Sequence, residues 1–264
     1  LYIINFTIDN KRPYNLESDK KGTLQVLQMD EQEYEEIIQC LIDKDGMVID
    51  EEEKNVNFMF EAAVGGAVPI IHGVRNCFEA SEINGIYGIL NGTTNYILTK
   101  MIQENLSFDV ALKQAQELGY AEADPSADID GDDIRRKLVI SANIAFDALL
   151  READIPMFGI RTVTDGDIKT FQSRGFACKL LAEASQAENG VCAYIEPTLV
   201  DAAALEAAVP ANFNLITYEG EQIGRQSFYG QGAGQMPTAA NVMQDCLSIQ
   251  EGRLGFYARQ AAPT

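Results

Sequence analysis

Histidine is almost absent from this chain of 264 residues, in which His72 is the only one. Ser-His-Asp and Cys-His catalysis both need an imidazole beside the nucleophile, and neither arrangement can be assembled around a single histidine. No His, Cys or carboxylate stands at metal-ligand spacing from His72 in the sequence. We therefore expect His72 to be a packing or surface residue.

Basic residues are also scarce, with 20 Lys and Arg against 40 Asp and Glu and a formal net charge of −20. Binding to the phosphates of a nucleic acid requires clustered Lys and Arg, so the composition excludes a nucleic-acid partner. A helix that spans a bilayer needs roughly 18 or more consecutive apolar residues, and the sequence contains no such run. We expect no membrane partner.

The five cysteines are odd in number and widely scattered, at positions 40, 77, 178, 192 and 246. This pattern favours reduced, mostly buried thiols over a disulfide framework, and no secretory leader precedes the first strand-like segment. We therefore expect a cytoplasmic protein. Cys178 lies in an apolar run with helical spacing and is interpreted as a buried thiol, not a nucleophile. Because position 1 is Leu and not Met, we also expect the chain to be cut or incomplete.

Glycine is rare in residues 1–55, where only Gly22 and Gly46 occur. The glycine-rich turn G-x-G-x-x-G that holds a dinucleotide phosphate is therefore missing from this part. It is polar and acidic, with strand-like runs at 1–8 and 23–29 and a helix-like run at 30–42. We predict a remnant or divergent, non-Rossmann segment at 1–55 and one domain at 56–264.

Beyond Asn55 the pattern alternates between strands and helices. We expect a strand that enters a glycine turn at 55–71, a strand, polar turn and helix at 85–102, and strands at 190–200 and 214–230. Further helices are expected at 107–119, 170–187 and 236–249. The candidate N-caps are Ser107 and either Thr93 or Thr94. This order predicts an α+β or α/β fold in which helices cover a mixed β-sheet.

The most unusual stretch is GYAEADPSADIDGDDIRRK at 119–137, where six carboxylates precede two arginines and a lysine. Aligned with an EF-hand loop, Asp128, Asp130 and Gly131 match positions three, five and six, but Lys137 occupies position twelve, where calcium needs a bidentate Glu. The sequence therefore excludes an EF-hand calcium site. A solvated acidic loop is the other simple interpretation of such a charge run.

The helix that follows argues against a purely solvated loop. At about 100° per residue, one of its stripes is apolar and comprises Ile134, Leu138, Ala142, Ala145 and Leu149. Asp133 and Lys137 lie in another column, which continues with Ile140 and Ile144, so we expect this ion pair to be partly buried. Two interpretations stay open: a lysine poised for proton transfer, or an i,i+4 pair that stabilises the helix surface.

Five segments of the chain carry a resemblance to a known family: NFMFEAAVGGAVPII, GIYGILNGTTNYILTKM, ELGYAEADPSADIDGDDIRRKL, DIPMFGIR and YGQGAGQMPTA. In this order and spacing they resemble the catalytic domain of homoserine dehydrogenases, from about Lys54 to about Ile249. The resemblance implies an NAD(P)-dependent oxidoreductase that interconverts L-homoserine and L-aspartate 4-semialdehyde in threonine, methionine and isoleucine biosynthesis.

The resemblance also implies roles for individual residues. Lys137 matches the general acid/base of the family, and Asp133 matches the partner that binds substrate and fixes the lysine. Glu122 matches the carboxylate that holds the substrate ammonium group. The other substrate-binding positions implied are Asp128, Thr93 and Thr94, and the glycines implied to line the cofactor are Gly119, Gly232 and Gly234.

Residues 61–68 match a family loop that encloses a monovalent cation, usually sodium, with main-chain carbonyls. The resemblance implies Glu61, Val64, Gly66 and Val68 as the contributing residues. The alternative is a tight strand-to-helix connection before Pro69.

The chain departs from the family in its first part. The family's nucleotide-binding domain lies there, and half of such a domain needs roughly 100 residues, whereas about 55 precede the similarity. Two hypotheses follow: a homoserine dehydrogenase that binds NAD(P), or a catalytically inactive homologue that serves as a small-molecule-binding or oligomerisation module. A homodimer through the catalytic sheet is implied by the resemblance.

Overall fold

A computed structural model describes residues 6–9, 56–78, 81–253 and 256 of the chain, in two compact units. Unit 1 comprises Leu1–Phe60 and Asp245–Thr264, and unit 2 comprises Glu61–Gln244. The predicted strand at 23–29 and helix at 30–42 lie outside the described residues. The predicted division at residue 55 therefore stays a prediction.

In unit 1 the described residues form a short antiparallel pair of strands, β1 (Phe6–Asp9) and β2 (Val56–Met59), with Phe6 opposite Met59. Phe60 follows β2 and packs edge to face on Phe256, with ring centroids 5.1 Å apart and ring planes at 79°. Both rings are buried, so this aromatic contact joins two ends of the unit that are distant in sequence.

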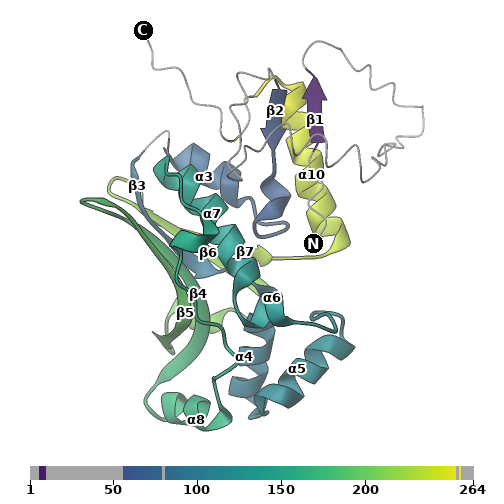
Figure 1. The fold of residues 1–264 in the computed structure, drawn as a ribbon, viewed down its shortest axis with the longest axis vertical. Coiled ribbons are helices and arrows are strands. Elements are labelled where there is room, and N and C mark those ends of the chain that lie inside the picture. Colours follow the sequence, from purple (N-terminus) through teal and green to yellow (C-terminus); the bar gives the residue numbers. More distant parts are fainter. Residues whose placement is uncertain (1–5, 10–55, 79–80, 254–255, 257–264) are drawn as a thin grey trace. The chain divides into compact units, whose positions relative to one another are not determined.

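Unit 2 is built on a five-stranded sheet in the order β5-β4-β3-β6-β7. Its strands are β3 (Ile83–Ile89), β4 (Phe176–Ala187), β5 (Gly190–Asp201), β6 (Phe213–Gly220) and β7 (Gly224–Gln231). Every neighbouring pair is antiparallel, and a single parallel bridge joins Met157 to Ile195 on β5. Together with its helices, the sheet confirms the predicted α+β class (Figure 1).

The helices of the described residues are α3 (Ile70–Phe78), α4 (Gly92–Glu104), α5 (Phe108–Glu117), α6 (Ser126–Ile129), α7 (Asp132–Phe146), α8 (Asp165–Ser173), α9 (Leu205–Ala208) and α10 (Gln235–Gln250), with 3-10 turns η1 (Glu61–Ala63) and η2 (Glu152–Asp154). Within unit 2, α3 and α7 lie on one side of the sheet, and α4, α5 and α8 lie at one end of it (Figure 1). Helices α3 and α7 pack together, and α7 also packs across β3, β4 and β5. None of the described helices is long and apolar enough to cross a membrane.

Helix α7 shows the predicted stripe, but the helix is shorter than expected. Ile134, Leu138, Ala142 and Ala145 are all buried, whereas Leu149 is 73% exposed. The helix ends at Phe146 because Asp147 adopts a left-handed conformation, with φ 47°, which interrupts the helical hydrogen bonds. Including Leu149 in the stripe was wrong.

The predicted helix at 170–187 was also wrong in most of its length. Helix α8 stops at Ser173, and Gly175, at φ 81°, turns the chain into β4. Residues 177–182 are buried on both faces of the sheet, so the strand lacks alternation and reads as a continuous apolar run that resembles a buried helix. Cys178 therefore lies on a strand; it is buried, as predicted, and burial raises the pKa of its thiol to about 11.

Strand β3 lies at the centre of the sheet and approaches β6 closely at Gly88. A Cβ atom built on Gly88 would lie 2.1 Å from the main-chain oxygen of Leu215. A Cβ atom on Gly85 of the same strand would meet only the Glu219 side chain, at 3.8 Å. The close pairing of β3 with β6 near Gly88 thus depends on the absence of a side chain.

Candidate active site

The acidic stretch folds into the short helix α6 and the first turns of the longer helix α7, with Asp130 and Gly131 between them. Asp128 lies on α6, and Asp133 and Lys137 lie on α7, with Gly131 between them at φ 105°. Carboxylates in the first turn of a helix are favoured by the partial positive charge of its N-terminus, and Asp132 and Asp133 occupy that turn. Gly131 supplies a conformation that few other residues adopt, so Asp128 can face α7.

Lys137 and Asp133 form the predicted ion pair, with Nζ and Oδ2 2.6 Å apart. Their side chains are 12% and 14% exposed, which confirms a partly buried pair. The Lys137 ammonium also donates to the main-chain oxygen of Leu90, at 3.0 Å, just beyond β3. An ammonium carries three N–H donors, so one is left for a ligand once these two acceptors of the described region are counted.

Asn91 connects the carboxylates of Asp128 and Asp133. Its place in the site was not predicted from the sequence. Its Nδ2 donates to Asp128 Oδ1 at 2.7 Å and to Asp133 Oδ2 at 2.8 Å. Its Oδ1 accepts from the Thr94 amide at 2.8 Å and so caps α4. The prediction that Thr93 or Thr94 is the N-cap was wrong, although Asn directly before a helix is a common cap.

The two threonines lie inside the first turn of α4, and both are buried. The Thr93 hydroxyl donates to the main-chain oxygen of Tyr120 at 2.7 Å, and the Tyr120 ring packs on Tyr96 of α4 at 5.1 Å. These contacts fasten the segment before Glu122 to α4. The carboxylate of Glu122 is itself exposed and takes part in none of the hydrogen bonds of the described cluster.

The pKa of the Asp128 carboxyl is raised above its ordinary value. Burial is the largest cause, and the nearby Asp133 carboxylate adds to it. The amide of Asn91, the hydroxyl of Thr93 and the ammonium of Lys137 act in the opposite direction. The net effect is that the protonated form of Asp128 is more favoured than in an exposed aspartate, chiefly because burial disfavours its charged form.

The three glycines implied to line a cofactor have local reasons for being glycine. Gly119 follows Leu118, the C-cap of α5, at φ 75°, and a Cβ there would meet nothing. A Cβ on Gly232 would lie 2.3 Å from the amide of Asn214, and one on Gly66 would lie 2.5 Å from the Gly232 oxygen. Gly234 has φ 134° and lies beside Pro237. Their role towards a cofactor stays a prediction.

The loop implied to enclose a cation is held by hydrogen bonds of its own. The Glu61 oxygen accepts from the Val64 amide at 3.3 Å, the Val68 oxygen from the Ile70 amide at 2.8 Å, and the Gly66 oxygen from Asn241 Nδ2 at 2.6 Å. Main-chain oxygens are suitable donors to a hard cation, and a carbonyl has a second lone pair. These main-chain oxygens fit a monovalent cation. Their hydrogen bonds also fit the alternative, a tight strand-to-helix connection before Pro69.

The side chain of Glu61 has a separate structural role. It is fully buried, and its carboxylate accepts from the amides of Ile71 at 2.9 Å and His72 at 2.7 Å at the start of α3. A carboxylate at this position satisfies amides that have no partner within the helix. His72 therefore contributes its main chain to a helix cap, and no group of three metal-ligating side chains occurs in the described region.

A second buried lysine was not found from the sequence. Lys179 on β4 is 2% exposed and donates to Asn95 Oδ1 and to the Val209 oxygen, both at 2.8 Å. Burial lowers the pKa of its ammonium from 10.5 to about 8. Because these acceptors are uncharged and its ammonium is sequestered, we interpret Lys179 as a structural residue.

The stability of the protein is expected to depend on the titration of Lys179. Between about pH 8 and 10.5 the unfolded chain binds a proton at this lysine that the folded protein does not, so stability rises with pH. Relative to Lys179→Met, the wild type should gain about 2 kcal/mol between pH 7 and pH 10. Urea unfolding of both proteins at these pH values measures the difference, and a constant difference would contradict the lowered pKa.

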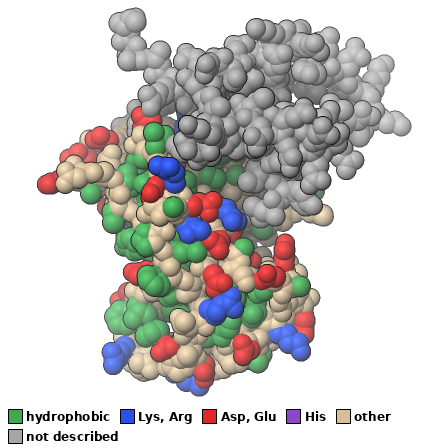
Figure 2. Space-filling view, viewed as in Figure 1, with side chains coloured by type: hydrophobic (Ala, Val, Ile, Leu, Met, Phe, Trp, Pro, Cys, Tyr) green, Lys and Arg blue, Asp and Glu red, His purple; other side chains and the backbone are tan. Residues whose placement is uncertain are grey.

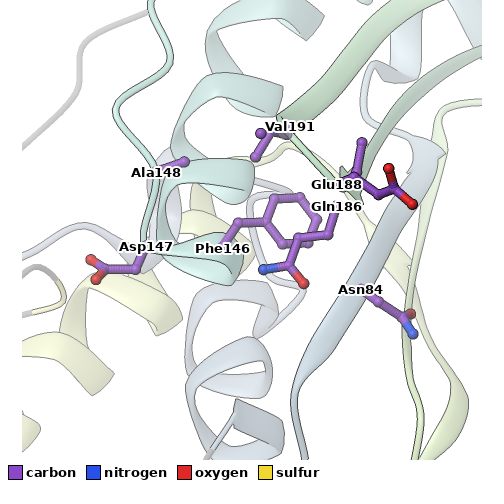
Figure 3. Close-up of a pocket in the computed structure, with 9 residues that line it drawn as sticks. Asn84, Phe146, Asp147, Ala148, Gln186, Glu188 and Val191 are labelled. Atoms are coloured by element: carbon purple, nitrogen blue, oxygen red, sulfur yellow. The ribbon is translucent and has the colours of Figure 1, made fainter.

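A pocket of about 720 Å³ lies away from this cluster, between the end of α7 and the turn of the β4–β5 hairpin. In Figure 3 the Phe146 ring lies beside the Gln186 amide, whereas the Asp147 carboxylate points away from the ring. Asn84, Ala148, Glu188 and Val191 complete the labelled lining. Its lining contains two carboxylates, Asp147 and Glu188, but no Lys, Arg or His, so it lacks a carboxylate–ammonium pair like that of Asp133 and Lys137.

Charged side chains elsewhere on the surface are mostly dispersed. On the face in Figure 2, Lys and Arg side chains lie singly among acidic ones. The exposed ion pairs of the described region include Arg161 with Asp130 at 2.7 Å and Lys169 with Asp165 at 3.2 Å. Exposed pairs of this kind contribute little to stability. The partly buried Lys137–Asp133 pair differs from them in its environment.

Comparison with known proteins gives a consistent result. The family model described as homoserine dehydrogenase matches residues 69–247. The chain is 38% identical over 218 residues to homoserine dehydrogenase of Lactococcus lactis subsp. lactis (strain IL1403), covering 81% of this chain and 51% of that protein. It is 37% identical over 210 residues to homoserine dehydrogenase of Bacillus subtilis (strain 168), covering 79% and 48%. The chain spans about half the length of the curated relatives it matches.

Solved structures agree. A homoserine dehydrogenase from Thiobacillus denitrificans has 40% sequence identity and a TM-score of 0.70, over 72% of this chain and 44% of that one. A hyperthermophilic archaeal homoserine dehydrogenase in complex with NADPH has 27% identity and a TM-score of 0.63, over 75% and 56%. Asn91, Asp128, Asp133 and Lys137 all lie within the residues matched by the family model.

Proposed function

Since this chain belongs to the homoserine dehydrogenase family, we propose that the protein interconverts L-homoserine and L-aspartate 4-semialdehyde. The observation that carries the proposal is the Lys137 ammonium, held by Asp133 Oδ2 at 2.6 Å and the Leu90 oxygen at 3.0 Å. Its third N–H can donate to the C4 oxygen of the substrate. When the aldehyde is reduced, Lys137 gives a proton to that oxygen, and it takes the proton back in the reverse direction.

Substrate binding in this proposal falls to the carboxylates around the lysine. The carboxylates of Asp128 and Asp133 lie together on one amide, so their negative charge exceeds the single positive charge of Lys137. A cationic amino group is attracted to such a site. We assign Glu122 to the substrate ammonium group, with Thr93 fixing the segment that carries it, and Thr94 to the wall of the substrate site.

The proposal includes NAD(P), which supplies or accepts the hydride at C4 when bound. The backbones of Gly66 and Gly232 lie close together where neither residue carries a side chain. A backbone without side chains fits a close approach of the nicotinamide end, which supports Gly232 and Gly234 as cofactor neighbours. Gly119 is the third position proposed. The described residues contain no G-x-G-x-x-G turn, and the proposal assigns none of them to the cofactor phosphates.

We further propose Na⁺ at the carbonyls of Glu61, Val64, Gly66 and Val68, and a cytoplasmic location. The oxygen donor set supports the cation, and a rise in melting temperature with NaCl but not with choline chloride would test it. Unpaired thiols at Cys178, Cys192 and Cys246 support a reducing compartment, and cell fractionation would test that.

A homodimer through the sheet is part of the proposal. On the side of the sheet away from α3 and α7, no described helix covers its upper part (Figure 1). This surface carries side chains that bond one another: Tyr194 Oη donates to Glu183 Oε2 at 2.6 Å, and Arg225 lies 5.1 Å from the centre of the Tyr87 ring. Aromatic residues and Arg are enriched in interfaces between subunits, which supports this face as the contact.

The experiment measures both activity and assembly. The full-length protein is incubated with L-homoserine and NAD or NADP, and absorbance of the reduced nicotinamide is followed; light scattering of the same preparation gives its mass. We expect a steady rise in absorbance and the mass of two chains. A flat trace from folded protein that still binds L-homoserine in calorimetry would favour the inactive binding module, and a monomer would refute the dimer.

A further inference from the structure

The side chain of Asn91 is buried, with 4% of the residue exposed, and both of its polar atoms form hydrogen bonds within the protein. Each of the two Nδ2 hydrogens serves a different carboxylate, at 2.7 Å to Asp128 and 2.8 Å to Asp133. The oxygen Oδ1 accepts from the Thr94 amide at 2.8 Å. A buried amide has two donors and one acceptor oxygen to satisfy, and here all are satisfied by the protein.

The orientation of this amide is fixed by its neighbours. If the oxygen and nitrogen of Asn91 were exchanged, the oxygen would face two carboxylates and the NH₂ group would face the Thr94 N–H. Both contacts would then be repulsive, because carboxylates only accept hydrogen bonds and a main-chain N–H only donates. The hydrogen-bonding pattern therefore permits a single arrangement of the side chain.

Through these bonds one side chain connects three elements. Asn91 begins α4, Asp128 belongs to α6, and Asp133 belongs to α7. Asp133 Oδ2 accepts from both Asn91 and Lys137, so the amide and the ammonium hold the same oxygen. Hydrogen bonds to an ionised group are shorter and stronger than those between neutral groups, and this pair limits how far the Asp133 carboxylate can turn.

We propose that Asn91 is a positioning residue, whose amide holds the carboxylates of Asp128 and Asp133 together and so keeps the Lys137 ammonium directed at the substrate oxygen. The inference rests on the proposed function for its effect on rate. It extends that function by assigning a role to a residue that touches neither the reacting atoms nor the cofactor in our proposal, and that acts through Asp133.

Two substitutions separate this role from helix capping. Asn91→Ser and Asn91→Asp both keep an oxygen that can accept from Thr94, and Ser and Asp are about as good as Asn at an N-cap. Neither keeps the NH₂ group that serves two carboxylates. If Asn91 only capped α4, Asn91→Ser would leave the site unchanged. Asn91→Asp also adds a third carboxylate beside Asp128 and Asp133.

The first measurement is the rate of homoserine oxidation in the full-length protein. We expect kcat to fall about 10²-fold in Asn91→Ser, because a catalytic group displaced by about 1 Å loses that much, and further in Asn91→Asp. Melting temperatures should stay close to the wild type. A matched cap variant, Thr164→Ala, removes the side-chain cap of α8 and should leave kcat unchanged. Wild-type kcat in Asn91→Ser would overturn the proposal.

The second measurement does not depend on activity. The carboxyl pKa of Asp128, followed by ¹³C NMR with Asp128→Asn for assignment, should rise in Asn91→Ser, because the Asn91 hydrogen bond lowers it in the wild type. It should rise further in Asn91→Asp and stay constant in Thr164→Ala. If the Asp128 pKa is unchanged in Asn91→Ser, the proposed role of the Asn91 amide is overturned, even if the wild type proves inactive. If the pKa rises but the wild type is inactive, the role of the amide is supported and the proposed enzymatic activity is refuted.

Discussion

Replacement of Lys137 by alanine is expected to lower kcat about 10³-fold while the protein stays folded. Proton transfer by a positioned side chain contributes between about 10²-fold and 10⁴-fold to the rate, and in the proposed reaction Lys137 is the only such group in contact with the C4 oxygen. Asp133 keeps its hydrogen bond to Asn91, so the carboxylate is not left without a donor. Steady-state rates with L-homoserine and melting curves measure the two effects.

The chain offers a matched control for this substitution. Lys169 on α8 follows Asp165 by one helical turn, in the same i,i+4 relation, but both side chains are more than half exposed, and Nζ lies 3.2 Å from Oδ2. Lys169→Ala should leave kcat unchanged. Lys137→Arg keeps the charge but holds its proton at any accessible pH, so its kcat should stay far below the wild type. Near-normal kcat in Lys137→Ala would refute the assignment of the proton donor.

Gly88→Ala is expected to destabilise the protein by about 3 kcal/mol, near the upper end of the usual cost of overpacking, because main-chain atoms would have to move. The new Cβ atom would lie 2.1 Å from the Leu215 oxygen and 2.8 Å from the Ile216 Cα. Both are main-chain atoms of β6, which cannot rotate away as a side chain can. Strand β3 would have to separate from β6 at the centre of the sheet.

Gly85→Ala is the control for this prediction, since a Cβ atom there meets only the Glu219 side chain at 3.8 Å. In a strand, alanine is no worse than glycine when the space is open, so Gly85→Ala should lose little or no stability. Urea denaturation gives the two free energies of unfolding. Equal losses in Gly85→Ala and Gly88→Ala would show that the close approach of the strands is not what requires a glycine.

Local patterns in the sequence predicted much of the site. The i,i+4 spacing of Asp133 and Lys137, in a column with two isoleucines, predicted a partly buried pair, and the structure confirms it. The spacing could not reveal that the ammonium also reaches the Leu90 oxygen, 47 positions away in sequence. Contacts of this kind depend on how α7 packs across β3, which no local pattern encodes.

The errors have physical causes that local rules do not contain. Strand β4 was interpreted as helix because residues 177–182 are buried on both faces, which removes the alternation that identifies a strand. Asn91 was passed over in favour of the threonines because any of these residue types can cap a helix. Only the positions of Asp128 and Asp133 in space show why the amide of Asn91 is needed.

The resemblance to a family supplied roles that geometry alone would not assign. It singled out Glu122, whose carboxylate is exposed in the structure, and the three glycines. It did not point to Lys179 or to the Glu61 carboxylate, because burial and helix capping in this chain become visible only when the elements are packed together.

Leu90 and Asn91 are consecutive residues. The main-chain oxygen of Leu90 accepts from the Lys137 ammonium, and the amide of Asn91 donates to Asp133, the partner of Lys137. An inserted or deleted amino acid between the end of β3 and the start of α4 would shift both contacts in a single event. A change in the length of this turn would therefore remove both contacts of the Lys137–Asp133 pair at once, and we expect its length to be constrained during evolution.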